Sequence, residues 1–238
     1  AVAQVTASLT NGSSVVAQFT GSAPPALAAL TPNLYIAMGA PVTWPVEAMV
    51  VSPKGAAVAG QSVNWSGCAG VAVQSRSSLS VVNGIAENTI TAGPFSVSVT
   101  ATASACLAGT ASCVNFYVIP VQPSTEGLIG SSGTAQYVTA GQAFAPMVLH
   151  VTDAFGHPVA GATVTLEEAF YGWTQPCGAP GGCGQAPLIA QQRVLAVSGL
   201  DGSVTQKPIS EGGLAGRLEV TAAVGTGTVL AIELQAHP

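Results

Sequence analysis

Charged side chains are scarce in this sequence. Lys and Arg number 5, Asp and Glu number 10, and together they make up only 6 % of the 238 residues, whereas a soluble globular domain carries roughly 25 %. The formal net charge is −5, and no basic stripe is present that would attract phosphates. Nucleic acid is therefore excluded as the expected partner.

Long hydrophobic runs are also missing. No segment approaches the 18 or more consecutive apolar residues that a membrane-spanning helix needs, so we expect no membrane insertion. The amino terminus lacks the charged-then-apolar layout of a signal peptide. The apolar content is nevertheless 48 %, which is enough to build packed cores, and the chain is expected to fold.

The residue patterns that carry catalysis or bind metal are absent as well. His150 and Asp153 are three positions apart in an extended segment, so strand alternation places them on opposite faces. The neighbouring Glu167 and Glu168 diverge for the same reason and do not form a paired-carboxylate site. No Asp-rich loop of the calcium-binding type occurs. The sequence predicts no enzyme, no catalytic residue, no cofactor and no metal.

The five cysteines include two close pairs in loop-like sequence. Cys106 lies near Cys113, and Cys177 lies near Cys183, whereas Cys68 has no close companion. The spacing favours two local disulfides and an extracellular or cell-surface location, because such bonds persist in oxidising compartments. Free thiols are the alternative.

Short strand-like runs rich in Val, Thr and Ala, broken by Gly, Pro and Asn-Gly, indicate an all-β chain. An internal duplication organises them, because "PVEAMVVSPKGAAVAGQSV" from Pro45 aligns without gaps on "PMVLHVTDAFGHPVAGATV" from Pro146, with seven identities in nineteen positions. The predicted strands are 45–52 and 62–66 in the first unit, and 146–153 and 162–168 in the second.

A second motif, a strand followed by a small-residue turn and a return strand, occurs three times, from Val5, Val99 and Val220. In the two complete units it follows Asn83-Gly84 or Asp201-Gly202, dipeptides that suit a tight type I′ turn. The expected domains are residues 1–21, the closing hairpin of an incomplete repeat; residues 22–121; and residues 122–238, with an insertion at 167–187.

These motifs carry a family resemblance. The order "GAAVAGQSVNW" or "GHPVAGATVTL", then Asn-Gly or Asp-Gly, then "VSVTATA" or "LEVTAAV" resembles bacterial immunoglobulin-like repeats of the invasin and intimin type, the Big_1 class. The resemblance implies tandem immunoglobulin-like β-sandwiches, here of seven or eight strands each, in surface adhesins and other cell-envelope proteins. It implies no catalytic residues. Trp65 is the expected core aromatic of the first unit, and Leu166 replaces it in the second.

The insertion exceeds what a scaffold needs. Phe170, Tyr171 and Trp173 stand within four residues, next to the Gly- and Pro-rich loop between Cys177 and Cys183. One interpretation is a contact loop for a host or surface protein or glycan, because rigid aromatic side chains bury a large area at low entropic cost. The other is that these side chains cap the open end of the second sandwich or pack on a neighbouring domain.

The first hairpin leads to two functional hypotheses. Val5, Ala7, Val15, Ala17 and Phe19 give it one face suited to a core, and an isolated hairpin is marginal in water. We therefore predict that it extends a sheet outside its own two sandwiches, most simply in another copy. The chain would then belong to a self-associating surface filament, sheath or array. The alternative is a stalk or binding segment of an invasin- or intimin-like adhesin, whose partners are neighbouring repeats.

Overall fold

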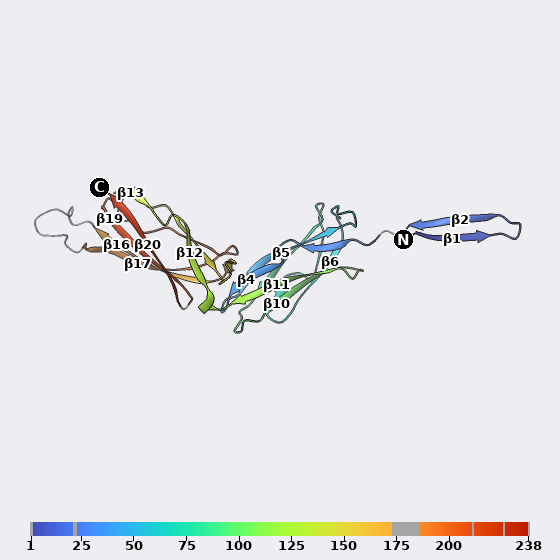
Figure 1. Cartoon of the computed structure of the whole chain (residues 1–238), viewed down its shortest axis with the longest axis horizontal. Helices are drawn as coiled ribbons and strands as arrows, with labels where there is room; N and C mark the ends of the chain where they lie inside the picture. Colours follow the sequence, from blue (N-terminus) through green and yellow to red (C-terminus); the bar gives the residue numbers. More distant parts are fainter. Residues whose placement is uncertain (1, 21–22, 173–185, 211, 226, 238) are drawn as a thin grey trace, which may run out of the picture.

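The computed structural model describes residues 2–20, 23–172, 186–210, 212–225 and 227–237. The described chain is nearly all β, with a single short 3₁₀ turn, η1 (Pro123–Thr125), between two sandwiches. Figure 1 shows these sandwiches one after the other along the long axis of the molecule. Among the described residues, no helix is long and apolar enough to cross a membrane.

The first sandwich contains strands β3 to β11, and the second contains β12 to β20. Their bounds are β3 Ala26–Ala29, β4 Asn33–Ala37, β5 Val42–Val51, β6 Ser62–Gly67, β7 Val71–Val73, β8 Ser77–Leu79, β9 Ile85–Ala92, β10 Ala101–Leu107, β11 Cys113–Val121, β12 Gly127–Ser132, β13 Tyr137–Thr139, β14 Met147–Thr152, β15 Val159–Ala160, β16 Thr163–Gly172, β17 Leu188–Val197, β18 Ser203–Gln206, β19 Gly216–Val224 and β20 Thr228–His237. Among the described residues the first unit exceeds the seven or eight strands expected, because short pieces such as β7 and β8 form separate strands, whereas the two sheets of the second unit contain eight strands as predicted.

In the first sandwich a sheet ordered β3-β5-β9-β7 packs against the larger sheet β4-β11-β10-β6-β8. Strand β5 alternates buried and less buried residues along its whole length, which places one face in the core. Trp65 is buried there as predicted, beside Phe116 and a second buried tryptophan, Trp44. The aromatic rings pack between the two sheets.

In the second sandwich a three-stranded sheet, β12-β14-β18, packs on the five-stranded sheet β13-β20-β19-β16-β17. Leu166 is fully buried in this core, as predicted. Alternation along β16 sends Glu168 and Phe170 inward and leaves Glu167 and Tyr171 on the outer face. The opposed directions of Glu167 and Glu168 are therefore confirmed.

The predicted type I′ turns are wrong. At Asn83-Gly84 the N–H of Val81 donates to the carbonyl of Ile85, and the N–H of Gly84 donates to the carbonyl of Val81. Type I′ needs a positive φ at both central residues, and among the described residues only glycines have one. The hydrogen bonds enclose a three-residue loop that ends in a left-handed glycine. Asp201-Gly202 repeats this geometry.

The Val-Ala-Gly segments, residues 58–60 and 159–161, form equivalent turns. In the first unit the Ser80 hydroxyl donates to the Val58 carbonyl and accepts from the N–H of Gln61. In the second unit Ser198 does the same with the Val159 carbonyl and the N–H of Ala162. One buried serine thus ties the turn in each sandwich.

Cys106 and Cys113 are disulfide-bonded, which confirms that pair. They lie directly opposite each other on β10 and β11, so the bond closes a short hairpin loop, and a loop of this size is worth about 2 to 3 kcal/mol. Cys68 is a free, exposed thiol beside Thr102, at the other end of β10. Cys177 and Cys183 lie outside the described residues.

The first hairpin consists of β1 (Val2–Ser8) and β2 (Ser14–Thr20). Its register pairs Val5 with Ala17 and Ala7 with Val15, so these four predicted residues share one face. No other described strand pairs with the hairpin, and Val5 and Val15 are 57 % and 72 % exposed. Phe19 lies on β2, and its side chain is outside the description.

Candidate interaction surfaces

The two sandwiches meet at a junction formed by β4 and the turn from Asp153 to Gly161. Strand β15 in this turn pairs in parallel with β4, opposing Val159 to Tyr35 and Ala160 to Ile36. The six-stranded sheet of the first sandwich therefore ends in a strand supplied by the second. Backbone pairing of this kind fixes direction and register between the two units.

Side chains reinforce this junction. The Tyr35 ring stacks on the His157 ring, with centroids 4.2 Å apart and planes 5° from parallel. His157 Nδ1 lies 2.9 Å from Asp153 Oδ2, and the N–H groups of Phe155 and His157 donate to Asp153 Oδ1. Burial would raise the pKa of Asp153, but the hydrogen bonds from His157 and Phe155 outweigh it and lower that pKa.

Residues of each sandwich are also buried in the core of the other. Ala160, from the second unit, is buried in the core of the first. Ala37 and Val121, from the first unit, are buried in the core of the second. Each sandwich thus completes the packing of the other, and separating them would expose apolar surface from both.

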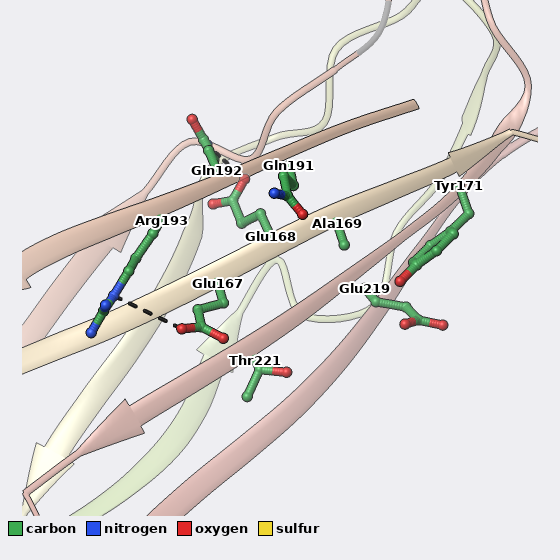
Figure 2. Close-up of a pocket in the computed structure, with 9 residues that line it drawn as sticks. All are labelled: Glu167, Glu168, Ala169, Tyr171, Gln191, Gln192, Arg193, Glu219 and Thr221. Carbon is green, nitrogen blue, oxygen red and sulfur yellow. Dashed lines mark hydrogen bonds and ion pairs between the residues drawn. The ribbon is translucent and has the colours of Figure 1, made fainter. Parts of the chain in front are cut away.

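A second surface is the outer face of the five-stranded sheet, where Figure 2 shows side chains projecting from β16, β17 and β19. It forms an open hollow of about 520 Å³. The hollow is lined by Glu167, Glu168, Ala169, Tyr171, Gln191, Gln192, Arg193, Glu219 and Thr221. For a chain so poor in charge, this face is polar and carries both signs.

Ion pairs on this face are exposed and weak. Arg193 lies 3.8 Å from Glu167, and both side chains are about two-thirds exposed. Arg217 pairs with Glu219 at 2.9 Å, and its guanidinium also lies 5.4 Å from the centre of the Tyr171 ring. Such pairs contribute roughly 0 to 1 kcal/mol each, so these charged side chains can leave one another and pair with charges on another molecule at little cost.

Glu168 borders the hollow, but its side chain points to the inward face of β16 and has a structural role. Its carboxylate accepts hydrogen bonds from the Nε2 atoms of Gln192 and Gln206 and from the N–H of Ile209. These donors come from β17, from β18 and from the segment after β18. The buried carboxylate therefore ties the two sheets together at one edge of the second sandwich.

The described side chains at these surfaces form neither a metal-binding cluster nor a His150–Asp153 pair. No group of three or more His, Cys, Asp or Glu side chains able to hold a metal ion occurs among the described residues. His150 and Asp153 form no hydrogen bond in the structure; Asp153 pairs with His157 instead. Both surfaces offer backbone edges, hydrogen bonds and a few rings, which suit binding.

The predicted aromatic contact loop needs correction. Phe170 is only 1 % exposed and belongs to the core of the second sandwich, because it lies on the inward face of β16. Tyr171 is on the outer face beside Arg217, and Trp173 lies outside the described residues. The insertion does not begin at 167, since β16 continues to Gly172 and β17 begins at Leu188.

Sequence reasoning missed the junction. The order Asp153, Phe155, Gly156, His157 was a usable signal, since an Asp that opens a turn commonly accepts hydrogen bonds from the next few N–H groups. The partner strand was not predictable, because Tyr35 stands more than one hundred positions earlier in the sequence.

Comparison with known proteins gives likeness at the level of structure only. No family model matches the sequence, and no curated protein matches it. Similar solved structures include the adhesin InvE of Yersinia pseudotuberculosis, with 17 % identity and a TM-score of 0.35. That match covers 89 % of this chain and 58 % of the InvE chain.

The D0-D1 domain of intimin shares 18 % identity at a TM-score of 0.34, over 89 % of this chain and 97 % of that one. The Escherichia coli adhesin FdeC shares 16 % identity at a TM-score of 0.32, over 93 % and 68 %. At TM-scores below 0.5 and identities below 20 %, these likenesses carry no argument about family, activity or partners.

Proposed function

We propose that this chain is a rigid spacer segment of an extracellular, adhesin-like repeat protein, and that it is not an enzyme. In this role the sandwiches hold other parts of a surface protein at a fixed distance and in a fixed direction. The observation that carries the proposal is the junction, where a strand of the second sandwich completes a sheet of the first.

Two further features support it. Units that share core residues and a stacked ring pair resist bending more than units joined by a flexible linker. The disulfide between Cys106 and Cys113 suits an oxidising compartment outside the cytoplasm.

Backbone ¹⁵N relaxation tests the spacer role. If the junction is rigid, amides in both sandwiches report one common rotational diffusion tensor. The double variant Tyr35→Ala, His157→Ala should let the two units tumble more independently, because it removes the ring stack. Tyr117→Ala, which truncates an exposed tyrosine on β11, is the matched control and should change nothing. Independent tumbling of the unmodified protein would contradict the proposal.

A second candidate function is a self-associating subunit of a filament, sheath or array, and the first hairpin favours it. Strands β1 and β2 pair only with each other among the described strands, and their shared face exposes Val5 and Val15. Joining a sheet of another copy would bury this face and pair the free edges.

Removal of residues 1–20 separates this candidate from the first. Both sandwiches should keep their melting temperatures, because their cores contain none of the hairpin residues whose burial the structure describes. Association between copies should be lost if the hairpin drives it. The pair Val5→Lys, Val15→Lys in the intact chain should act like the deletion, and unchanged association in both would refute the hairpin's role.

A further inference from the structure

The junction has two halves, and each half has a counterpart at the opposite end of the same molecule. One half is an edge strand, where Tyr35 and Ile36 of β4 receive a partner. The other half is a Val-Ala-Gly turn, where Val159 and Ala160 provide that partner. Because the two sandwiches are built on one repeat, the second also has such an edge strand and the first also has such a turn.

Strand β13 is the counterpart of β4. It pairs in parallel with the last strand of its sandwich, as β4 does with β11. Tyr137 opposes Gln235, two positions before the pairing of β13 with β20 ends. Tyr35 likewise opposes Ile119, two positions before the pairing of β4 with β11 ends. Val138 packs on the core of the second sandwich, which matches the inward position of Ile36.

In contrast to β4, β13 is at the edge of its sheet and no further described strand pairs with it. The Tyr137 ring stacks loosely on His237, with centroids 5.9 Å apart, and Tyr137 is still 74 % exposed. A tyrosine at the position that docks the next unit inside the molecule is therefore open at the far end of the second sandwich.

The turn Val58-Ala59-Gly60 is the counterpart of Val159-Ala160-Gly161. The residues are identical, a buried serine holds both turns, and the two glycines have φ values of +72° and +74°. Their surroundings differ. Val159 and Ala160, which pair with β4, are 0 % and 1 % exposed, and Ala160 is buried in the core of the first sandwich, whereas Val58 is half-buried and Ala59 is exposed.

The space next to the two glycines also shows that the second turn is covered and the first is open. A Cβ on Gly161 would lie 2.6 Å from Val42 Cγ2 of the first sandwich, whereas a Cβ on Gly60 would meet nothing within 4 Å. The turn of the first sandwich thus has the same backbone shape as the turn at the junction, but no described strand covers it.

We propose that the Tyr137–Thr139 strand of one copy pairs in parallel with Val58-Ala59 of a second copy, as β4 pairs with β15 inside each chain. The contact joins two different surfaces, so it does not close on itself and builds an end-to-end chain of copies. This inference goes beyond the spacer role and uses the junction that supports it.

One difference sets the strength of the contact. The position of His157 is occupied by Ala56 in the first turn, so the ring stack is lost between copies. Inside the chain, moreover, the linker keeps the two halves at high local concentration, which free copies lack. We therefore expect weak association, visible only in concentrated solution or where copies are crowded on a surface.

Sedimentation velocity on residues 1–238, over a series reaching about 1 mM, tests the proposal. The unmodified protein should form dimers and longer chains as its concentration rises. Tyr137→Lys blocks the strand half, and Ala59→Lys blocks the turn half; each variant alone should associate at least about tenfold more weakly. Tyr117→Lys changes another exposed tyrosine and should associate normally.

Mixing the two blocked variants is the decisive step. The Ala59→Lys chain keeps a working strand and the Tyr137→Lys chain keeps a working turn, so the mixture should form dimers and nothing longer. The proposal is overturned if the unmodified protein stays monomeric throughout the series, if the mixture gives no dimer, or if removing residues 1–20 abolishes association, since the hairpin would then be the contact.

Failure here is distinguishable from failure of the spacer role. Relaxation measured on the Tyr137→Lys monomer reports only the internal junction, which that substitution does not touch. Common tumbling without association would reject the contact between copies and keep the spacer role. Independent tumbling would reject the spacer role.

Discussion

Asp153 is the residue on which the hydrogen bonds of the junction turn converge. One carboxylate oxygen accepts two N–H groups, and the other bonds to His157, which in turn stacks on Tyr35 of the other sandwich. The Asp153 side chain, which is less than a tenth exposed, thus holds the His157 ring of the second unit against Tyr35 of the first.

The lowered pKa of Asp153 gives a pH prediction. Because the folded-state pKa is below the ordinary 3.8, the ionised carboxylate stabilises the fold above that pH, and the contribution is lost as the pH falls through the folded-state value. Asp153→Asn should therefore lower the denaturation midpoint at pH 7, and the difference from the unmodified protein should shrink below about pH 4. A difference independent of pH would contradict this.

Glu126, just after η1, should behave in the opposite way. Burial raises its pKa above the ordinary 4.5, so its contribution to stability is fully present below that pH and is lost as the pH rises through the folded-state value. Glu126→Gln should raise the denaturation midpoint at neutral pH and have little effect at pH 3. A destabilised Glu126→Gln protein at pH 7 would show that the charge is needed.

At the scale of elements, the Val-Ala-Gly turn has the same hydrogen bonds in both sandwiches, but only the second turn also forms part of the junction. Ser80 and Ser198 tie their turns identically, so the turn's shape is set within each unit. Only the second turn becomes strand β15, because only there does another unit provide a strand to pair with.

Substituting these serines separates the local and the junction effects. Either Ser→Ala change leaves an N–H without its acceptor, a buried one at Ala162 and a partly buried one at Gln61, and an unsatisfied buried N–H costs about 1 to 3 kcal/mol of unfolding free energy. Ser198→Ala should in addition loosen the junction, seen as separate tumbling of the sandwiches, whereas Ser80→Ala should leave their common tumbling intact. Equal relaxation changes in both variants would refute a special role for the second turn.

At the scale of the whole molecule, the two sandwiches should be energetically coupled because each buries residues of the other. Gly60→Ala and Gly161→Ala impose the same backbone strain, roughly 1 to 2 kcal/mol, since both glycines have positive φ. Only Gly161→Ala also pushes a methyl group against Val42.

Urea unfolding followed separately in each sandwich measures this coupling. Gly161→Ala should lower the midpoints of both units, because its clash lies between them. Gly60→Ala should lower only that of the first. If Gly161→Ala affects the second sandwich alone, the units are independent and the shared packing carries no cooperative free energy.

Much of the fold was predictable because it depends on local pattern. Alternation of apolar residues fixed the strands around Pro45 and Pro146, the burial of Trp65 and Leu166, and the opposite directions of Glu167 and Glu168. The spacing of Cys106 and Cys113 favoured the disulfide, which the structure confirms because the two residues face each other across a hairpin. The type I′ turns were wrong because Asn and Asp kept negative φ and only the glycines adopted the left-handed conformation.

The sequence alone determined the two repeats, their strands and the hairpin that precedes them, since each follows from contacts within a short stretch. Tertiary structure decided which exposed groups became an interface. Phe170 went into the core because β16 runs on past the expected start of the insertion. Tyr35 lies against His157 because β15 pairs with β4, and no local pattern records a contact between residues so distant in sequence.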